Sequence, residues 1–309
     1  MKKILITGAW KYSEGEYAYL WEKGYDICFV QNEKDALPPE ACQAEFIICN
    51  SLFLYHSIEK FTCLKAVQLT SAGYDRVPMD YAREHGITVY NAKNVYSKPM
   101  AEFAVGGVLE LYKKFGFFAE NQKNHKWEKH RGLLELTDKA VCIVGCGDVG
   151  KECARKFKAF DCRVIGVDKY PAEHPHFDEM FDIADIDKIL PCADILVLSV
   201  PLTEETYHLI GKDRLELLKG TAAIVNISRG AVVDTEALIG ALPDLGGAVL
   251  DVFEKEPLSE NSPLWDMENV IITPHNSFVG EKNGERLFRV IAENLTTFRS
   301  DIIDENDQN

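Results

Sequence analysis

The sequence predicts an α/β fold built from two doubly wound parallel-sheet domains. The chain has 309 residues, which is enough for two domains that each bury a hydrophobic core. Short apolar runs alternate with mixed polar segments through the first hundred residues, and the same alternation resumes at Ala140. Strands that are separated by helical segments pair in parallel, and their helices cover both faces of the sheet.

Five apolar runs in the first hundred residues predict the strands of the first sheet. They lie at 3–7, 26–30, 45–49, 66–69 and 87–90. A loop of small residues that includes Ala72 and Gly73 follows the fourth run, at the edge of the sheet where α/β folds bind ligands. Its backbone N–H groups are able to hold a carboxylate, although this segment alone favours an ordinary turn.

A long apolar helix is predicted between the two sheets. The polar segment 91–99 contains Pro99 and suits a hinge, and apolar residues then recur at helical spacing over 101–118. A basic, histidine-rich segment follows at 124–131. A helix with this much apolar surface packs between domains or between subunits. We therefore expect a homodimer built on 101–118 and the aromatic segment after it.

A glycine-rich turn opens the second domain. Gly145, Gly147 and Gly150 follow the apolar run 140–144 with the spacing G-x-G-x-x-G. Apolar residues at helical spacing come next, and a second apolar run, 163–167, ends in Asp168. The succession of strand, glycine turn, helix, strand and acidic residue is the full context of a Rossmann dinucleotide-binding motif. The alternative is a tight turn between strand and helix that binds no ligand.

Each part of this motif has a physical role in holding a dinucleotide. A helix N-terminus offers unpaired N–H groups and a positive dipole end to a pyrophosphate. Gly145 and Gly147 keep side chains away from the phosphates, and Gly150 lets the helix lie close to the strand. The carboxylate of Asp168 is placed to accept hydrogen bonds from the adenosine ribose. Because it would repel a 2′-phosphate, the sequence favours NAD over NADP, with Lys169 as the one neighbour that opposes this preference.

Three later strands end beside residues that carry chemistry. The predicted strands are 194–200, 221–227, 246–250 and 270–273. Arg229, Glu256 and His275 follow the last three of them, each beside a glycine or proline turn. Taken singly, each has a simpler interpretation as a capping or surface residue. Because parallel strands end at one edge of the sheet, we expect the three to converge where a nicotinamide ring would lie.

These three residue types suit the reduction of a 2-keto acid. An arginine fork binds the carboxylate and polarises the keto oxygen. A protonated imidazole gives its proton to that oxygen as the hydride arrives. A carboxylate bonded to the other ring nitrogen orients the imidazole. The predicted catalytic residues are therefore Arg229, Glu256 and His275, and the predicted partner is a small anionic 2-keto or 2-hydroxy acid.

Several segments in order along the chain resemble the D-isomer-specific 2-hydroxyacid dehydrogenase family. They are SAGYD, NAKNVYSKPMAE, GCGDVG, VPLTEET, NISRG, DVFEKEPL and TPH. The resemblance implies that Arg229, Glu256 and His275 form a catalytic triad, and that Ala72 and Gly73 hold the substrate carboxylate. It also implies that Asp251 holds the nicotinamide carboxamide. With the glycine turn, the expected cofactor-binding residues are Gly145, Gly147, Asp148, Val149, Gly150, Asp168, Val200, Pro201, Thr206, Ile227, Ser228, Asp251 and His275.

The resemblance also implies the domain organisation. A flavodoxin-like catalytic domain would comprise 1–100 plus 281–309, and a Rossmann NAD domain, 101–280, would be inserted into it. The segment after His275 departs from the smaller, glycine-rich run of the family, which bears on the shape of the substrate pocket. Two alternatives stay open: a short 3-phosphoglycerate dehydrogenase, and an NAD(H)-sensing binding protein like the corepressors of the family.

Composition limits the partners and the compartment. The net charge of −15 argues against nucleic acid and anionic membranes as partners. No stretch reaches the length of a membrane-spanning helix. The nine cysteines are odd in number and lack a CxxC pair, which indicates reduced core residues in a cytoplasmic protein and no metal site.

Overall fold

The computed structural model describes residues 2–306, with side chains described as far as Phe298. The chain divides into two compact units, 1–96 with 280–309 and 97–279, so that the second unit is inserted between two segments of the first. The domain limits predicted from the sequence, 1–100 plus 281–309 and 101–280, refer to functional domains. These limits remain a prediction. None of the helices in the described part of the chain has the length and apolar character that crossing a membrane requires.

The first unit contains a five-stranded parallel sheet. Its strands are β1 (Lys2–Thr7), β2 (Tyr25–Val30), β3 (Phe46–Cys49), β4 (Ala66–Leu69) and β5 (Thr88–Tyr90), and its α-helices are α1 (Glu14–Glu22), α2 (Met79–Glu84) and α9 (Asn283–Asn306). The strand order β2-β1-β3-β4-β5 is that of flavodoxin-like folds. The capping box of Ser13 and Glu16 fixes the start of α1, because each side chain bonds to the backbone of the other residue.

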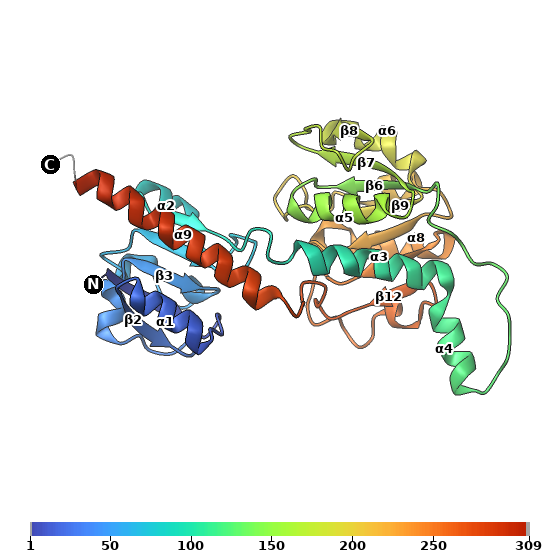
Figure 1. Ribbon diagram of the computed structural model, residues 1–309. Helices are drawn as coiled ribbons and strands as arrows, with labels where there is room; N and C mark the ends of the chain where they lie inside the picture. Colours follow the sequence, from blue (N-terminus) through green and yellow to red (C-terminus); the bar gives the residue numbers. More distant parts are fainter. Residues whose placement is uncertain (1, 307–309) are drawn as a thin grey trace. The chain divides into compact units, whose positions relative to one another are not determined.

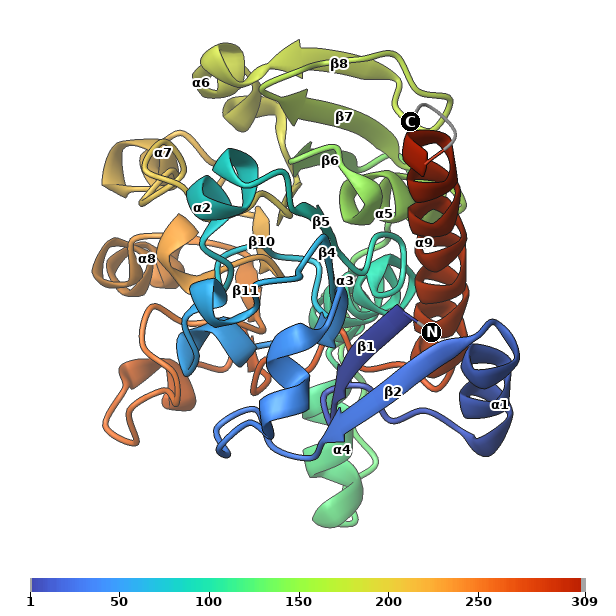
Figure 2. The same ribbon diagram turned by 90° about the vertical axis from the view of Figure 1, so that its left-hand side faces the viewer.

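Alternate residues of these strands face two separate cores. Ile4 and Ile48 pack with apolar residues of α1 and α9 on one face. Leu5 and Ile47 pack with α2 and the segment around Phe61 on the other face. Figure 1 and Figure 2 show α1 and α9 on the same side of this sheet. The first sheet is therefore covered on both faces, as predicted for a doubly wound domain.

The second unit contains a seven-stranded parallel sheet. Its strands are β6 (Ala140–Val144), β7 (Arg163–Asp168), β8 (Glu179–Asp182), β9 (Ile195–Leu198), β10 (Ala223–Asn226), β11 (Gly247–Leu250) and β12 (Val270–Ile272). Its α-helices are α3 (Ser97–Lys113), α4 (Phe115–Lys123), α5 (Asp148–Lys158), α6 (Ile186–Ile189), α7 (Lys212–Glu216) and α8 (Thr235–Ala241). The order β12-β11-β10-β9-β6-β7-β8 contains the Rossmann arrangement, with the switch point between β6 and β9.

Two cores again cover the two faces of this sheet. Val141 and Val225 face α3 and α5, whereas Val144 and Ile224 face α6, α7 and α8. The fold class is thus confirmed: two doubly wound parallel sheets, with a Rossmann unit inserted into a flavodoxin-like one. The edge strand β8 was not predicted, because its side chains are only half-buried or exposed and EMFD gives no continuous apolar run.

The prediction of one continuous helix over 101–118 is wrong. The segment forms two helices, which meet at Lys114 with a left-handed φ of 52°. The first of them, α3, starts earlier than predicted, because Pro99 is tolerated in the first turn of a helix. The apolar face of α3 is buried against the sheet and α5 of its own unit. Its apolar character is therefore explained within one chain, and the exposed apolar residues lie further on.

Candidate active site

The chain turns sharply at the glycine-rich segment between β6 and α5. Gly145 has a φ of +93°, a conformation that L side chains rarely adopt. A Cβ atom at Gly150 would lie 2.0 Å from the carbonyl oxygen of Gly145, so α5 packs against the turn at a distance that only glycine permits. A Cβ atom at Gly147, by contrast, would meet nothing within 4 Å. The turn is closed toward the sheet and open at the N-terminus of α5.

This open side fits the pyrophosphate of a dinucleotide. Gly147 is the N-cap of α5, and Asp148 and Val149 are half-buried residues of its first turn. The first N–H groups of a helix point out of its N-terminus, and the helix dipole favours an anion there. The residues present therefore match the chemistry of NAD at its most highly charged part.

The carboxylate of Asp168, at the end of β7, accepts two backbone hydrogen bonds. Oδ2 accepts from the N–H of Cys146 at 2.6 Å, and Oδ1 accepts from the N–H of Tyr170 at 2.9 Å. The first of these bonds joins the end of β7 to the glycine turn. Because a carboxylate has about four acceptor sites, it retains capacity for ribose hydroxyls.

The thiol of Cys146 is buried beneath the glycine turn. Its Sγ lies 3.7 Å from the carbonyl oxygens of Ile143 and Val167. Burial, with the Asp168 carboxylate nearby, raises the pKa of Cys146 to about 12. A thiol that stays protonated is a poor nucleophile and a poor metal ligand. Cys146 is a packing residue of the turn, a role that the sequence alone did not assign.

The end of β9 lies against the same turn. Ser199 Oγ donates to the carbonyl oxygen of Gly145 at 2.7 Å, and a Cβ atom at Gly145 would lie 2.8 Å from the backbone nitrogen of Val200. Val200 is buried, whereas Pro201 is exposed. Sequence reasoning missed Ser199, because its partner is a backbone atom of a different strand end.

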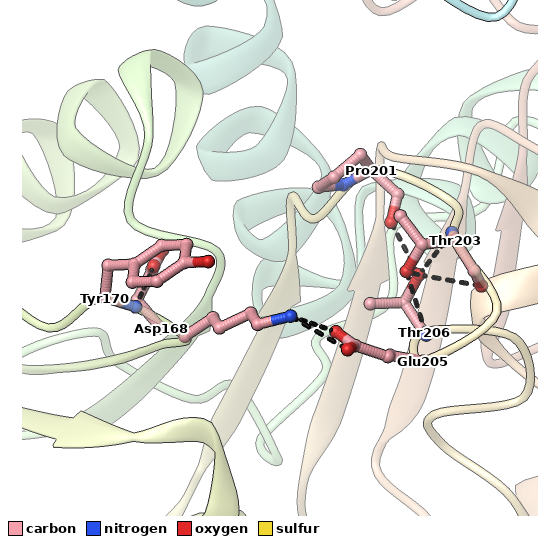
Figure 3. A network of polar contacts seen from close by, with 7 residues as sticks. Asp168, Tyr170, Pro201, Thr203, Glu205 and Thr206 are labelled. Atoms are coloured by element: carbon pink, nitrogen blue, oxygen red, sulfur yellow. Dashed lines mark hydrogen bonds and ion pairs between the residues drawn. The ribbon is translucent and has the colours of Figure 1, made fainter. Parts of the chain in front are cut away.

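The loop after β9 is held by its own side chains (Figure 3). Thr206 Oγ1 donates to the carbonyl oxygen of Pro201 at 2.7 Å. The N–H of Thr203 donates to Thr206 Oγ1, also at 2.7 Å. The hydroxyl of Thr206, which was predicted to line the adenosine site, therefore closes this loop.

The turn after β10 carries Arg229 and is organised by Asn226. The Oδ1 atom of Asn226 accepts from the N–H and the hydroxyl of Ser228 at 3.1 and 2.8 Å, and its Nδ2 donates to the carbonyl oxygen of Arg229 at 3.0 Å. Arg229 is half-buried, and its Nη1 donates to the carbonyl oxygen of Ser228 at 2.8 Å. Ile227 is buried in the core. Asn226, which sequence reasoning missed, thus sets the path of the residues predicted around it.

Direct contacts link the loops after β10, β11 and β12, which are neighbouring strands. A Cβ atom at Gly230, next to Arg229, would lie 1.8 Å from the carbonyl carbon of Phe253. The N–H of Phe253 donates to Glu256 Oε1 at 3.1 Å, and Glu256 Oε2 lies 2.9 Å from His275 Nδ1. The three predicted catalytic residues therefore come from three touching loops at one edge of the sheet.

The backbone at His275 is in the left-handed region, with a φ of 51°. Its N–H donates to the carbonyl oxygen of Asp251 at 2.8 Å. The side chains of His275 and Glu256 are 41% and 37% exposed, so both are accessible to a ligand. The bond from Glu256 to Nδ1 leaves Nε2 as the ring nitrogen available for exchange of a proton.

Glu254, two residues before Glu256, has a different partner. Its Oε2 lies 3.1 Å from His208 Nε2, and its Oε1 accepts from the N–H of Thr235 at 2.9 Å. Partial burial opposes ionisation of Glu254, but the bonds to Thr235 and His208 outweigh it and hold its pKa below the usual value. Of the two glutamates, Glu256 is the one bonded to His275.

Asp251 is fully buried and holds the loop that carries His275. Its Oδ1 accepts from the hydroxyl of Thr273 at 2.6 Å and from the N–H of Asn276 at 2.7 Å, and its Oδ2 accepts from the N–H of Ser277 at 2.9 Å. The predicted contact of Asp251 with the nicotinamide carboxamide would therefore need a lone pair of the carboxylate that these three hydrogen bonds do not use. Positioning of His275 is the role that the observed bonds give to Asp251.

In the first unit, Ala72 and Gly73 lie in the loop after β4. Asn91 Nδ2 donates to the carbonyl oxygen of Ala72 at 2.7 Å, and Ser71 Oγ donates to that of Gly73 at 3.1 Å. Both carbonyl groups are thereby occupied by side chains. Across residues 2–306, the N–H groups of Ala72 and Gly73 donate to no protein acceptor.

Acidic, cysteine and histidine side chains do not form a metal centre in the part of the chain that the structure describes. The Rossmann sheet, the open glycine turn and the acid at the end of β7 define the second unit as a dinucleotide-binding domain of the NAD-dependent class.

Comparisons with known proteins narrow this class to one family. Residues 105–277 match the family model described as D-isomer specific 2-hydroxyacid dehydrogenase, NAD binding domain. The chain is 34% identical to the glyoxylate reductase of Thermofilum pendens over 244 residues, which is 75% of this chain and 71% of that protein. It is also 34% identical to the D-3-phosphoglycerate dehydrogenase of Methanocaldococcus jannaschii over 242 residues, 77% of this chain and 46% of that protein.

A solved structure of a D-isomer specific 2-hydroxyacid dehydrogenase family protein from Aeromonas salmonicida has 28% sequence identity and a TM-score of 0.82. The match covers 97% of this chain and 96% of that chain. The protein belongs to the D-isomer specific 2-hydroxyacid dehydrogenase family. It is an NAD-dependent enzyme that transfers hydride between the cofactor and a 2-hydroxy or 2-keto acid.

Proposed function

We propose that this enzyme reduces a small 2-keto acid of the glyoxylate type, with Arg229, Glu256 and His275 as its catalytic residues. The observation that carries the proposal is the 2.9 Å contact between Glu256 Oε2 and His275 Nδ1, on loops that touch the turn of Arg229. The relatives named glyoxylate reductase, such as that of Thermofilum pendens, support the substrate class.

Each of the three side chains has one task in this reaction. NADH, when bound, supplies the hydride that is added to the keto carbon. The guanidinium of Arg229 binds the substrate carboxylate and stabilises the charge that develops on the keto oxygen. His275 donates its Nε2 proton to that oxygen, so that the product is a hydroxyl group. Glu256 keeps the imidazole oriented through Nδ1.

The cofactor would lie along the strand ends of the second unit. The turn from Gly145 to Gly150 takes the pyrophosphate, and Asp168 takes the adenosine ribose. Val200, Pro201 and the loop closed by Thr206 form the neighbouring wall. Ile227, Ser228 and Asp251 support the nicotinamide end, the last of them chiefly by holding the loop of His275.

The proposed catalytic domain, 1–100 plus 281–309, would contribute to substrate binding. The N–H groups of Ala72 and Gly73 point to a carboxylate as their acceptor, because a backbone pair of this kind suits an anion. Arg76 follows the same loop, and its Nη1 donates to Asn50 Oδ1 at 2.9 Å. A cation at this edge of the sheet is the reason to test a phosphorylated keto acid, which is the second candidate substrate.

The test is a panel of keto acids with NADH oxidation as the readout. Glyoxylate, hydroxypyruvate, pyruvate and 3-phosphohydroxypyruvate should be compared by kcat/KM. We expect turnover of at least one of the first three and weaker turnover of the phosphorylated compound. Preference for 3-phosphohydroxypyruvate would establish the phosphoglycerate dehydrogenase alternative. Tight NADH binding without turnover of any compound would favour an NAD(H)-sensing protein.

The proposed homodimer would use an arm formed by 115–135, which comprises α4 and the segment after it (Figure 1). Trp127 is 99% exposed and Phe115 is 56% exposed. A cavity of about 830 Å³ is lined by Phe118, Asn121, Gln122 and 125–131. Within the described residues, the buried Nδ2 of Asn121 has no hydrogen-bond partner. An exposed tryptophan beside a cavity and an unsatisfied amide favours a partner surface here.

Trp127→Glu should weaken the dimer, because an exposed tryptophan at an interface is commonly a hot spot. We expect the dimer dissociation constant to rise by about 30-fold or more, corresponding to about 2 kcal/mol. Trp21→Glu is the matched control, since Trp21 is 56% exposed but lies on α1 of the other unit. Sedimentation velocity at micromolar concentration is the measurement. A wild-type protein that sediments as a monomer would rule out this assembly.

We also propose a cytoplasmic location. All nine cysteines are free thiols, and Cys142, Cys146 and Cys153 are buried with strongly raised pKa values because of that burial. Free thiols are typical of reducing compartments.

A further inference from the structure

A salt bridge joins the two loops at the adenosine end of the Rossmann sheet. Lys169 follows Asp168 in the loop after β7, and Glu205 lies in the loop after β9. Lys169 Nζ donates to both carboxylate oxygens of Glu205, at 2.8 and 2.6 Å. Figure 3 shows Glu205, with dashed lines that mark the two bonds to its carboxylate.

Both ends of this salt bridge are held by backbone contacts. Asp168 Oδ1 accepts from the N–H of Tyr170, which fixes the turn that contains Lys169. Thr206 Oγ1 bonds to Pro201 and Thr203, which fixes the loop on both sides of Glu205. Exposed salt bridges generally contribute little, in part because two flexible side chains must be ordered. Here the backbones that carry the two charges are already ordered. Forming the salt bridge therefore requires ordering of the two side chains alone.

The chemistry of this corner bears on the choice between NAD and NADP. NADP differs from NAD by a phosphate on the adenosine ribose, at the hydroxyl that the acid at the end of the second Rossmann strand binds. A lysine next to that acid is a suitable partner for such a phosphate. In this structure the ammonium group of Lys169 is engaged by Glu205. The bond to Glu205 also raises the pKa of Lys169.

We propose that Glu205 is a cofactor-specificity residue, which engages Lys169 and thereby withholds it from the 2′-phosphate of NADP. The corner then presents two carboxylates, Asp168 and Glu205, against one ammonium group. An incoming phosphate would meet a net negative field and would have to displace Glu205 from Lys169. The ribose hydroxyls of NAD carry no charge and meet neither obstacle. This inference rests on the proposed placement of the adenosine ribose at Asp168.

The experiment compares NADH and NADPH dissociation constants by fluorescence titration at low ionic strength. Wild type should bind NADH more tightly than NADPH, because Asp168 repels the phosphate and Glu205 engages Lys169. Glu205→Gln keeps the size of the side chain and removes its charge. NADPH should then bind about twofold to fivefold more tightly, with NADH affinity nearly unchanged.

Two further variants separate the salt bridge from general charge. Glu204→Gln makes the same change in net charge one residue away, at an exposed side chain, and should alter the preference little. The double variant Lys169→Ala with Glu205→Gln should lose the gain in NADPH affinity. Equal gains in Glu204→Gln and Glu205→Gln, or a gain that survives loss of Lys169, would overturn the assignment. The experiment measures cofactor binding without turnover. Its result can therefore be interpreted even if the enzyme does not reduce the proposed keto acids.

Discussion

Replacing His275 with asparagine is expected to lower kcat for keto-acid reduction by about 100-fold to 10,000-fold. The variant removes the proton donor, while NADH should bind almost as tightly as in wild type. Asparagine is the suitable substitute because residue 275 has a φ of 51°, which asparagine tolerates better than most residues. Steady-state kinetics together with NADH titration provide the measurement.

His208→Asn is the matched control for this prediction. His208 also has a positive φ, 48°, and also contacts a glutamate, but its partner is Glu254 instead of Glu256. We expect its kcat to stay within a few fold of wild type, roughly the effect of a change away from the reacting atoms. Comparable losses in the two variants would mean that the substitution acts through the fold. A His275→Asn enzyme with full activity would remove histidine from the proposed reaction.

Replacing Arg229 with lysine should reduce kcat/KM for the keto acid by about 100-fold, with NADH affinity preserved. Lysine keeps the positive charge but lacks the planar fork that binds a carboxylate with two parallel hydrogen bonds. Lysine also has a single side-chain nitrogen, whereas Arg229 uses one nitrogen, Nη1, for the bond to the carbonyl oxygen of Ser228. Kinetics with glyoxylate and titration with NADH separate the two effects.

Arg214→Lys is a suitable comparison for Arg229→Lys. Arg214 also donates to a backbone carbonyl group, that of Leu209, and its Nε donates to Asp187. Its substitution should change stability slightly and kcat/KM hardly at all. If Arg229→Lys weakened NADH binding while the KM for glyoxylate stayed constant, Arg229 would be a cofactor residue.

Much of the fold was predictable from the sequence because parallel strands are buried on both faces. The run 140–144 is continuously apolar and the run 66–69 contains one polar residue, Gln68, and the structure has strands with those limits. The strand β8 was missed because an edge strand is partly exposed and needs no such run. The break at Lys114 was missed because it depends on one backbone conformation, which the apolar pattern does not report.

The candidate site was predictable at the level of residue type and less so at the level of contacts. The glycine spacing and the three strand ends predicted which residues would lie close together, since the ends of parallel strands share one edge of the sheet. The roles of Asn226, Ser199 and Asp251 in holding turns were not visible, because their partners are mostly backbone atoms. A sequence pattern shows which side chains are present but does not show which backbone groups need a partner.

The covering of one sheet face by α9 also determines an order of events during synthesis. Ile4, Ile48 and Ala66 on that face pack with Leu287 and Ile291 of α9, which are made only after the whole of the second unit. The inserted unit is a continuous stretch of chain and has its full set of strands before α9 exists. On the ribosome, the amino-terminal segment therefore waits with part of its core uncovered until α9, which is translated after the inserted unit, completes the first unit.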